Sequence, residues 1–180
     1  MRRILGESIP VLTLSISIGI MAGQILSTKE ESLLLVPLLL VLIPPINNAA
    51  GMLGSVLGAR VSTGLHSGSL FADGARQFRR DVVAIFVLGT ATFALLAALA
   101  FGSGLTFAPT APDDLADVVL AVLASGAVLL IGMVTVVIVI GSLSFRLGWD
   151  PDNVIIPVVT ATGDILGIGS LILMVQWVGL

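Results

Sequence analysis

Long apolar runs, separated by short polar or turn-forming segments, dominate the chain. Five of these runs are long enough to cross a hydrocarbon core of ~30 Å, which takes ~20 helical residues. The separators are rich in charge, glycine or proline, as is typical of loops between helices. The pattern predicts five transmembrane helices, over residues 8–27, 33–60, 82–101, 118–143 and 154–178.

The predicted fold is therefore an all-α integral membrane protein. We expect one transmembrane domain over residues 1–180, with no soluble domain at either end, and the lipid bilayer as its solvent. Of the residues, 57% are apolar and 11% charged, against ~25% charged in soluble domains. The first apolar run is interpreted as a retained helix because it is long for a signal peptide.

The basic residues predict the orientation, because cytoplasmic loops are enriched in Lys and Arg. All but Lys29 fall before the first run, around the end of the second, or between the fourth and fifth: Arg2, Arg3, Arg60, Arg76, Arg79, Arg80 and Arg146. We expect the N-terminus in the cytoplasm, and five crossings then place the C-terminus outside.

Composition argues against several classes of function. A net charge of -3 gives no basic surface for nucleic acid. With no cysteine, no tyrosine and one histidine, thiolate sites and histidine-based triads are hard to assemble. His66 itself is interpreted as a solvated interfacial residue rather than a metal ligand.

The second run carries a strong helix-breaking signal. Pro44 and Pro45 are adjacent, and Asn47 and Asn48 follow them directly. Two prolines remove two backbone donors, so we expect this helix to kink or break open there. Pro44 lies roughly 16 Å into the run at ~1.5 Å per residue, which is near mid-membrane.

Asp164 is the only acidic residue deep in any run. It lies roughly 15 Å from the start of the fifth run, at about the depth of the proline pair. A mid-membrane carboxylate costs at least ~2.5 kcal/mol and needs a compensating partner. A bound cation is one such partner, and a structural hydrogen bond between helices is the other reading.

Two segments resemble the MgtE-type magnesium transporters and their relatives in the solute carrier 41 family. The first is PPINNAAGMLGS at residues 44–55, continuing to ARVSTGLH at residues 59–66. The second is DPDNVIIP at residues 150–157, followed by TATGD at residues 160–164. They resemble the second-helix and fifth-helix signatures of that family, and Met52 stands where the family has asparagine.

The resemblance implies a function and a site. It implies a divalent cation transporter that holds Mg²⁺, largely through its water shell, at Asp164. Thr160, Asn47 and Asn48 are the further implied metal contacts. The resemblance also implies that the pore is lined by Gly51, Gly163, Pro44 and Pro45.

The resemblance further implies a homodimer in the cell membrane, since relatives pair two such five-helix units. Two alternatives remain open: a transporter of another divalent cation or a cation-coupled solute, and a non-transporting assembly subunit with a structural Asp164. We expect no enzyme activity. An intramembrane aspartyl protease would need Gly-x-Gly-Asp and a second deep acid, and the chain has neither.

Overall fold

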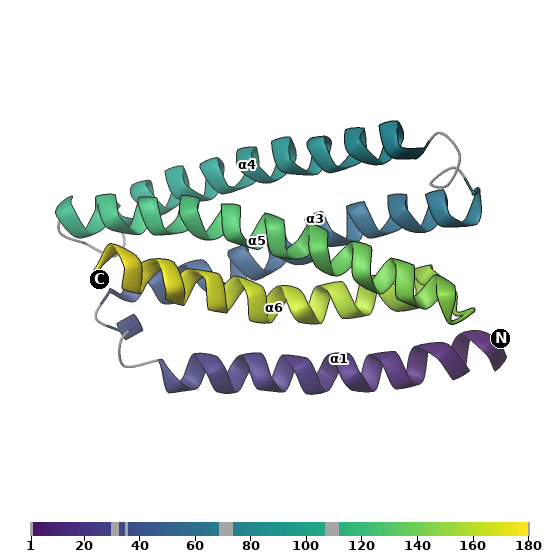
Figure 1. The fold of residues 1–180 in the computed structure, drawn as a ribbon. Helices are drawn as coiled ribbons and strands as arrows, with labels where there is room; N and C mark the ends of the chain where they lie inside the picture. Colours follow the sequence, from purple (N-terminus) through teal and green to yellow (C-terminus); the bar gives the residue numbers. More distant parts are fainter. Residues whose placement is uncertain (1, 30–32, 35, 69–73, 107–111, 180) are drawn as a thin grey trace.

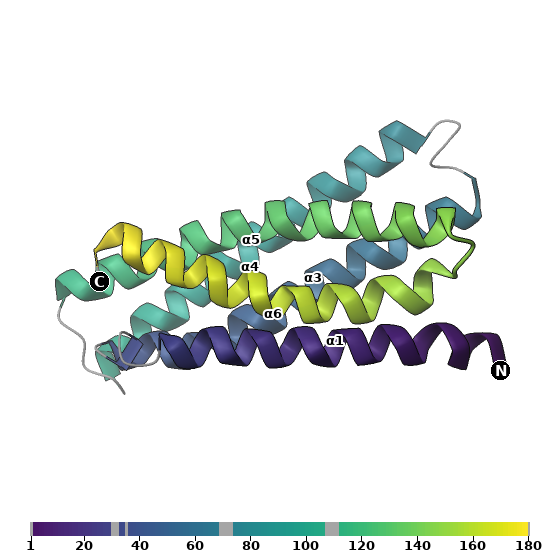
Figure 2. The same cartoon turned by 60° about the horizontal axis from the view of Figure 1, so that its bottom comes forward.

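The computed structural model describes residues 2–29, 33–34, 36–68, 74–106 and 112–179. Its long helices lie side by side in one bundle, with α3 and α4 inclined to the others (Figures 1 and 2). In chain order they are α1 (Arg2–Thr28), α3 (Pro37–His66), α4 (Gly74–Thr106), α5 (Pro112–Arg146) and α6 (Pro151–Val178).

The prediction of five transmembrane helices is confirmed. Each of these helices is long and apolar enough to cross a membrane, and each coincides with one of the predicted runs. The start of α1 and the end of α6 lie at opposite ends of the bundle (Figure 1). We call the end where α3 finishes and α1, α4 and α6 begin the His66 end.

The helix termini are set by local sequence. Pro37 and Pro151 stand in the first turn of α3 and α6, where the missing N–H costs no helical hydrogen bond. Asp150 is the N-cap of α6, and its carboxylate accepts from the Asp152 backbone N–H at 3.1 Å. Gly179 closes α6 with a φ of 96°, a left-handed conformation that favours glycine.

Helix α6 lies at the centre of the bundle. It packs against α1, α3 and α5, whereas α4 packs against α3 and α5. Within the described residues, α1 packs against α6 and no other helix, and Figure 2 shows the two running alongside each other. Large apolar side chains such as Ile16, Leu95 and Leu99 are exposed on the outer helices, as expected of surfaces that face lipid.

Small residues let α3 approach α6 closely. A Cβ atom at Gly54 would overlap Met133 and Val159, and one at Gly58 would overlap Ile155. Close approach of backbones is the usual role of small residues between membrane helices. The α3–α6 contact therefore depends on glycine in the half of α3 nearer the His66 end.

The expected break at the proline pair is not observed. Helix α3 is continuous from Pro37 to His66, with Pro44 and Pro45 inside it. Each ring removes one hydrogen bond and crowds the carbonyl four residues earlier, although its fixed φ is itself helical. Transmembrane helices tolerate such prolines where neighbouring groups compensate for the loss. The donors lost are those that would bond the carbonyls of Leu40 and Val41. Buried packing of Leu42 and Ile43 before the pair and of Ile46 after it stabilises the helix on either side.

Candidate functional site

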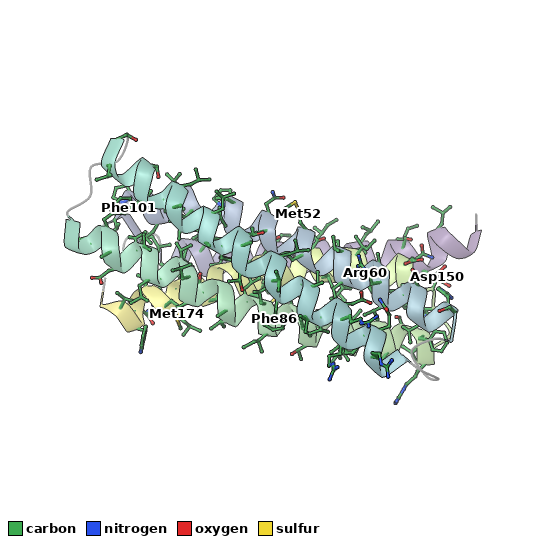
Figure 3. The ribbon with its side chains drawn as sticks, turned by 90° about the horizontal axis from the view of Figure 1, so that it is seen from above. Met52, Arg60, Phe86, Phe101, Asp150 and Met174 are labelled. Carbon is green, nitrogen blue, oxygen red and sulfur yellow. The ribbon has the colours of Figure 1, made fainter. Side chains whose placement is uncertain are left out.

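A groove of about 720 Å³ lies between α3 and α6. Its walls include most of the polar residues singled out from the sequence, together with apolar neighbours: Ile43, Pro44, Asn47, Asn48, Gly51, Met52, Ser55, Thr160 and Asp164. Met52 is labelled about halfway along α3 in Figure 3, with its side chain on the bundle surface. The groove is thus set against the middle of the two helices.

Asp164 and Asn47 form the polar centre of this groove. Asp164 lies midway along α6 and is half-buried. The Asn47 side chain of α3 is its polar neighbour across the helix contact. The carboxylate and the amide, 117 residues apart in the sequence (164 minus 47), therefore meet across the helix contact.

The other side of the Asn47 amide packs against Gly167. Among the described residues, the Asn47 Oδ1 atom is buried without a hydrogen-bond partner, and a Cβ atom at Gly167 would overlap it. Gly167 therefore leaves the space that Asn47 occupies. Nothing in the sequence marks Gly167 as functional, because its contact is with a side chain of another helix.

Thr160 lies one turn before Asp164 and is exposed to the groove. Its hydroxyl donates to the Ile156 carbonyl at 2.9 Å, which leaves the hydroxyl oxygen available as an acceptor. Because α6 is continuous here, the Thr160 backbone carbonyl accepts the helical hydrogen bond from the Asp164 N–H. The side-chain oxygen is therefore the better-placed contact for a ligand.

Two of the predicted pore-lining residues are not among the residues that line the groove. Gly163 is buried against α3, where an added Cβ would lie 3.2 Å from Ala50 Cβ and 3.5 Å from the Gly51 nitrogen. Pro45 is half-buried beside the groove. The groove is also lined by Ile43, Met52 and Ser55. These residues lie on the same face of α3 as Asn48.

The comparison with known families decides the class of protein. The sequence profile of the family described as MgtE, divalent cation transporter, matches residues 43–174. The chain belongs to the MgtE family. No curated protein and no solved structure matched the chain in the corresponding searches.

The MgtE match covers the whole groove. Its range runs from the first lining residue, Ile43, past the last, Asp164. Helix α1 lies outside the match. The chain is thus a multi-pass membrane protein of a divalent cation transport family, which is a family of transporters rather than of enzymes.

The chemistry of the groove suits the cargo of an MgtE protein. Its polar groups are one carboxylate, two amides and two hydroxyls, from Asp164, Asn47, Asn48, Thr160 and Ser55. Oxygen donors are the ligands that Mg²⁺ and other hard divalent cations take. One carboxylate with neutral oxygen groups is a sparse donor set, better matched to a hydrated ion than to a stripped one.

A second cluster lies at the His66 end. Ligand atoms of His66, Asp150 and Asp152 all lie within 4.8 Å of one another. Helix capping accounts for this arrangement, because the Asp150 carboxylate accepts from the Asp152 N–H and lies 3.2 Å from His66 Nε2. His66 is exposed and meets Phe145 edge-on. We assign no cation to this cluster.

Proposed function

We propose that the chain transports Mg²⁺ as a largely hydrated ion, with Asp164 as the central site. The observation that carries this proposal is the groove, which brings Asp164 together with Asn47, Asn48 and Thr160 from two helices. These four residues are the proposed cation contacts. Gly51 and Pro44 line the same path, and residues 1–180 form one transmembrane domain.

We also propose that two copies form the pore, groove facing groove. Asn48 and Thr160 are exposed near the middle of membrane-length helices, and polar groups at that depth need cover from protein or water. A second copy supplies that cover and leaves a water-filled path between the grooves. Two Asp164 carboxylates brought together repel each other, and a divalent cation between them offsets that repulsion.

The proposed orientation has the His66 end in the cytoplasm of the cell, with the protein in the plasma membrane. Exposed arginines Arg60, Arg76, Arg79 and Arg80 gather at or near this end. Basic residues at one membrane surface favour the cytoplasmic side. In this orientation the groove lies between the cytoplasmic and outer surfaces, as a transport path requires.

The experiment that tests the cation site is Mg²⁺ flux into proteoliposomes. Asp164→Asn keeps the side-chain size and removes the charge, so we expect flux to fall at least about tenfold, the factor of ~1.4 kcal/mol. Asp117→Asn is the matched control, because Asp117 lies near the start of α5 and away from the groove. Equal flux from native protein and Asp164→Asn, at equal reconstitution, would exclude the proposed site.

A softer divalent cation is a second candidate cargo, and Met52 is the observation that favours it. Its thioether lines the groove, and thioethers prefer softer metals than Mg²⁺. We expect Met52→Asn to weaken inhibition of Mg²⁺ flux by Co²⁺ about fivefold, the size of a modest ligand contribution. Met52→Leu, which keeps the bulk and loses the sulfur, separates a sulfur contact from a steric one. Unchanged Co²⁺ inhibition in both variants would leave Mg²⁺ as the better candidate.

A further inference from the structure

Glu7 is a buried carboxylate outside the groove and outside the MgtE match. It lies on α1 and is 9% exposed. Its Oε2 atom accepts from the Asp150 backbone N–H at 3.2 Å and from the Asn153 side-chain amide at 3.1 Å. A buried carboxylate is tolerated when such donors satisfy it, so these bonds tie α1 to the first turn of α6.

The geometry is that of a capping box completed by another helix. In a capping box, the side chain at the third helical position reaches back to the N–H of the N-cap residue. In α6 the N-cap is Asp150 and the third position is Asn153. Here Glu7 takes the N-cap N–H, and Asn153 donates to Glu7. The negative charge of Glu7 also suits the positive end of the α6 dipole.

The same end of α6 is tied to α3. Asp150, whose backbone N–H donates to Glu7 of α1, lies 3.2 Å from His66 Nε2 through its carboxylate. Figure 3 shows Asp150 beside the start of α1, at the end of the bundle away from the groove. Farther along α6, Val154 and Val158 pack on Val11 of α1. Asn47 and Asp164 then lie on the two helices whose ends meet at Asp150.

We propose that Glu7 is a positioning residue for the cation groove. By completing the cap of α6, it fixes the position of α6 along the bundle axis. That position places the Asp164 carboxylate opposite Asn47, so loss of the Glu7 contacts weakens cation binding 157 residues away in sequence (164 minus 7). This inference rests on the proposed function of the groove.

Exchanging the two partners tests the contact directly. Asn153→Asp places a second carboxylate against Glu7 and breaks the pairing, since like charges in contact repel. Glu7→Gln combined with Asn153→Asp restores it in reverse: the glutamine amide donates to the new carboxylate, and its carbonyl accepts from the Asp150 N–H. Thr13→Val is the control on α1, because the Thr13 hydroxyl is exposed and donates to the Ile9 carbonyl of its own helix.

The readout is Mg²⁺ protection of one cysteine in the groove. The chain has no cysteine, so Ser55→Cys introduces a single thiol at a lining position. The rate at which a thiol reagent modifies it, measured against Mg²⁺ concentration, gives the midpoint of cation binding. Each variant is made in this background and measured on the fraction that elutes as folded protein.

We expect Asn153→Asp to raise the midpoint about fivefold, the lower end of coupling between separate sites. The exchange variant should return to within about twofold of the starting midpoint, and Thr13→Val should leave it unchanged. If Asn153→Asp is not recovered folded, Asn153→Ala, which deletes one donor, should raise the midpoint about twofold.

If Asn153→Asp leaves the midpoint of Mg²⁺ protection unchanged, Glu7 is not a positioning residue. The same holds for Asn153→Ala where that variant replaces Asn153→Asp. An exchange variant that stays as weak as Asn153→Asp also overturns the positioning role. A cysteine that Mg²⁺ fails to protect even with Glu7 and Asn153 intact overturns the proposed cation site itself, and the inference with it. The Ser55→Cys protein with Glu7 and Asn153 intact therefore tells failure of the cation site apart from failure of the positioning role.

Discussion

At the scale of single residues, the groove depends on how Asn47 is held between two parts of α6. One side of its amide meets Asp164, and its Oδ1 atom lies against Gly167. An amide confined in this way presents a fixed face to the carboxylate. The space above Gly167 is therefore as important for the site as the polar groups themselves.

Gly167→Ala should weaken Mg²⁺ transport. The added methyl group overlaps Asn47 Oδ1 and pushes the amide away from Asp164. Loss of a polar contact to a charged group corresponds to roughly a tenfold increase in the Mg²⁺ concentration for half-maximal flux.

Gly169→Ala is the matched control for this prediction, since a Cβ atom there meets nothing within 4 Å. Both variants add the same methyl group to the same helix, so propensity effects cancel. If the two variants have equal Mg²⁺ concentrations for half-maximal flux, the contact between Asn47 and Gly167 does not affect transport.

The sequence could indicate some site residues and not others. Asp164, Asn47 and Asn48 stand out because polar groups are rare within apolar runs. Gly167 and Glu7 were missed for a physical reason: each acts through a side chain or backbone group on another helix. Their partners, Asn47 and Asp150, become neighbours only when the helices pack.

At the scale of the elements, the apolar runs predicted the helices well, because length and hydropathy alone decide what crosses a bilayer. The proline pair was predicted to break α3, and the helix continues through it. The effect of proline on a helix is local, whereas α3 is also held by its packing against α4, α5 and α6. Tertiary packing therefore outweighed the local signal.

Gly54→Ala should destabilise the contact between α3 and α6. The added Cβ overlaps Met133 and Val159, two side chains from different helices. Overpacking of a tight contact typically costs about 1–3 kcal/mol, so thermal unfolding in detergent should begin at a lower temperature.

Gly19→Ala on α1 provides the comparison, because a Cβ atom there meets nothing within 4 Å. It should unfold at or slightly above the native temperature, given the higher helix propensity of alanine. A Gly54→Ala protein as stable as the Gly19→Ala protein would mean that the α3–α6 contact adjusts freely.

At the scale of the whole molecule, a single copy leaves the polar groove open on one side, and the proposed dimer closes it. Cysteine at Asn48 should cross-link two copies under mild oxidation, because the proposed dimer brings the two grooves face to face. Cysteine at Ile16, an exposed position on α1, should not. The measurement is the fraction of dimer on a non-reducing gel, from protein in native-like lipid.

Cross-linking at Ile16 but not at Asn48 would place α1, rather than the groove, at the dimer contact. The pore would then lie within one copy. Because the native chain has no cysteine, each variant reports on one position only.

The odd number of crossings has a consequence for how such a pore can be built. The first helix begins and the last helix finishes at opposite ends of the bundle (Figure 1). Two copies joined tail to head by a short linker would have to insert with opposite polarity. A pore with both copies pointing the same way therefore requires separate polypeptides, or a connector that itself traverses the bilayer.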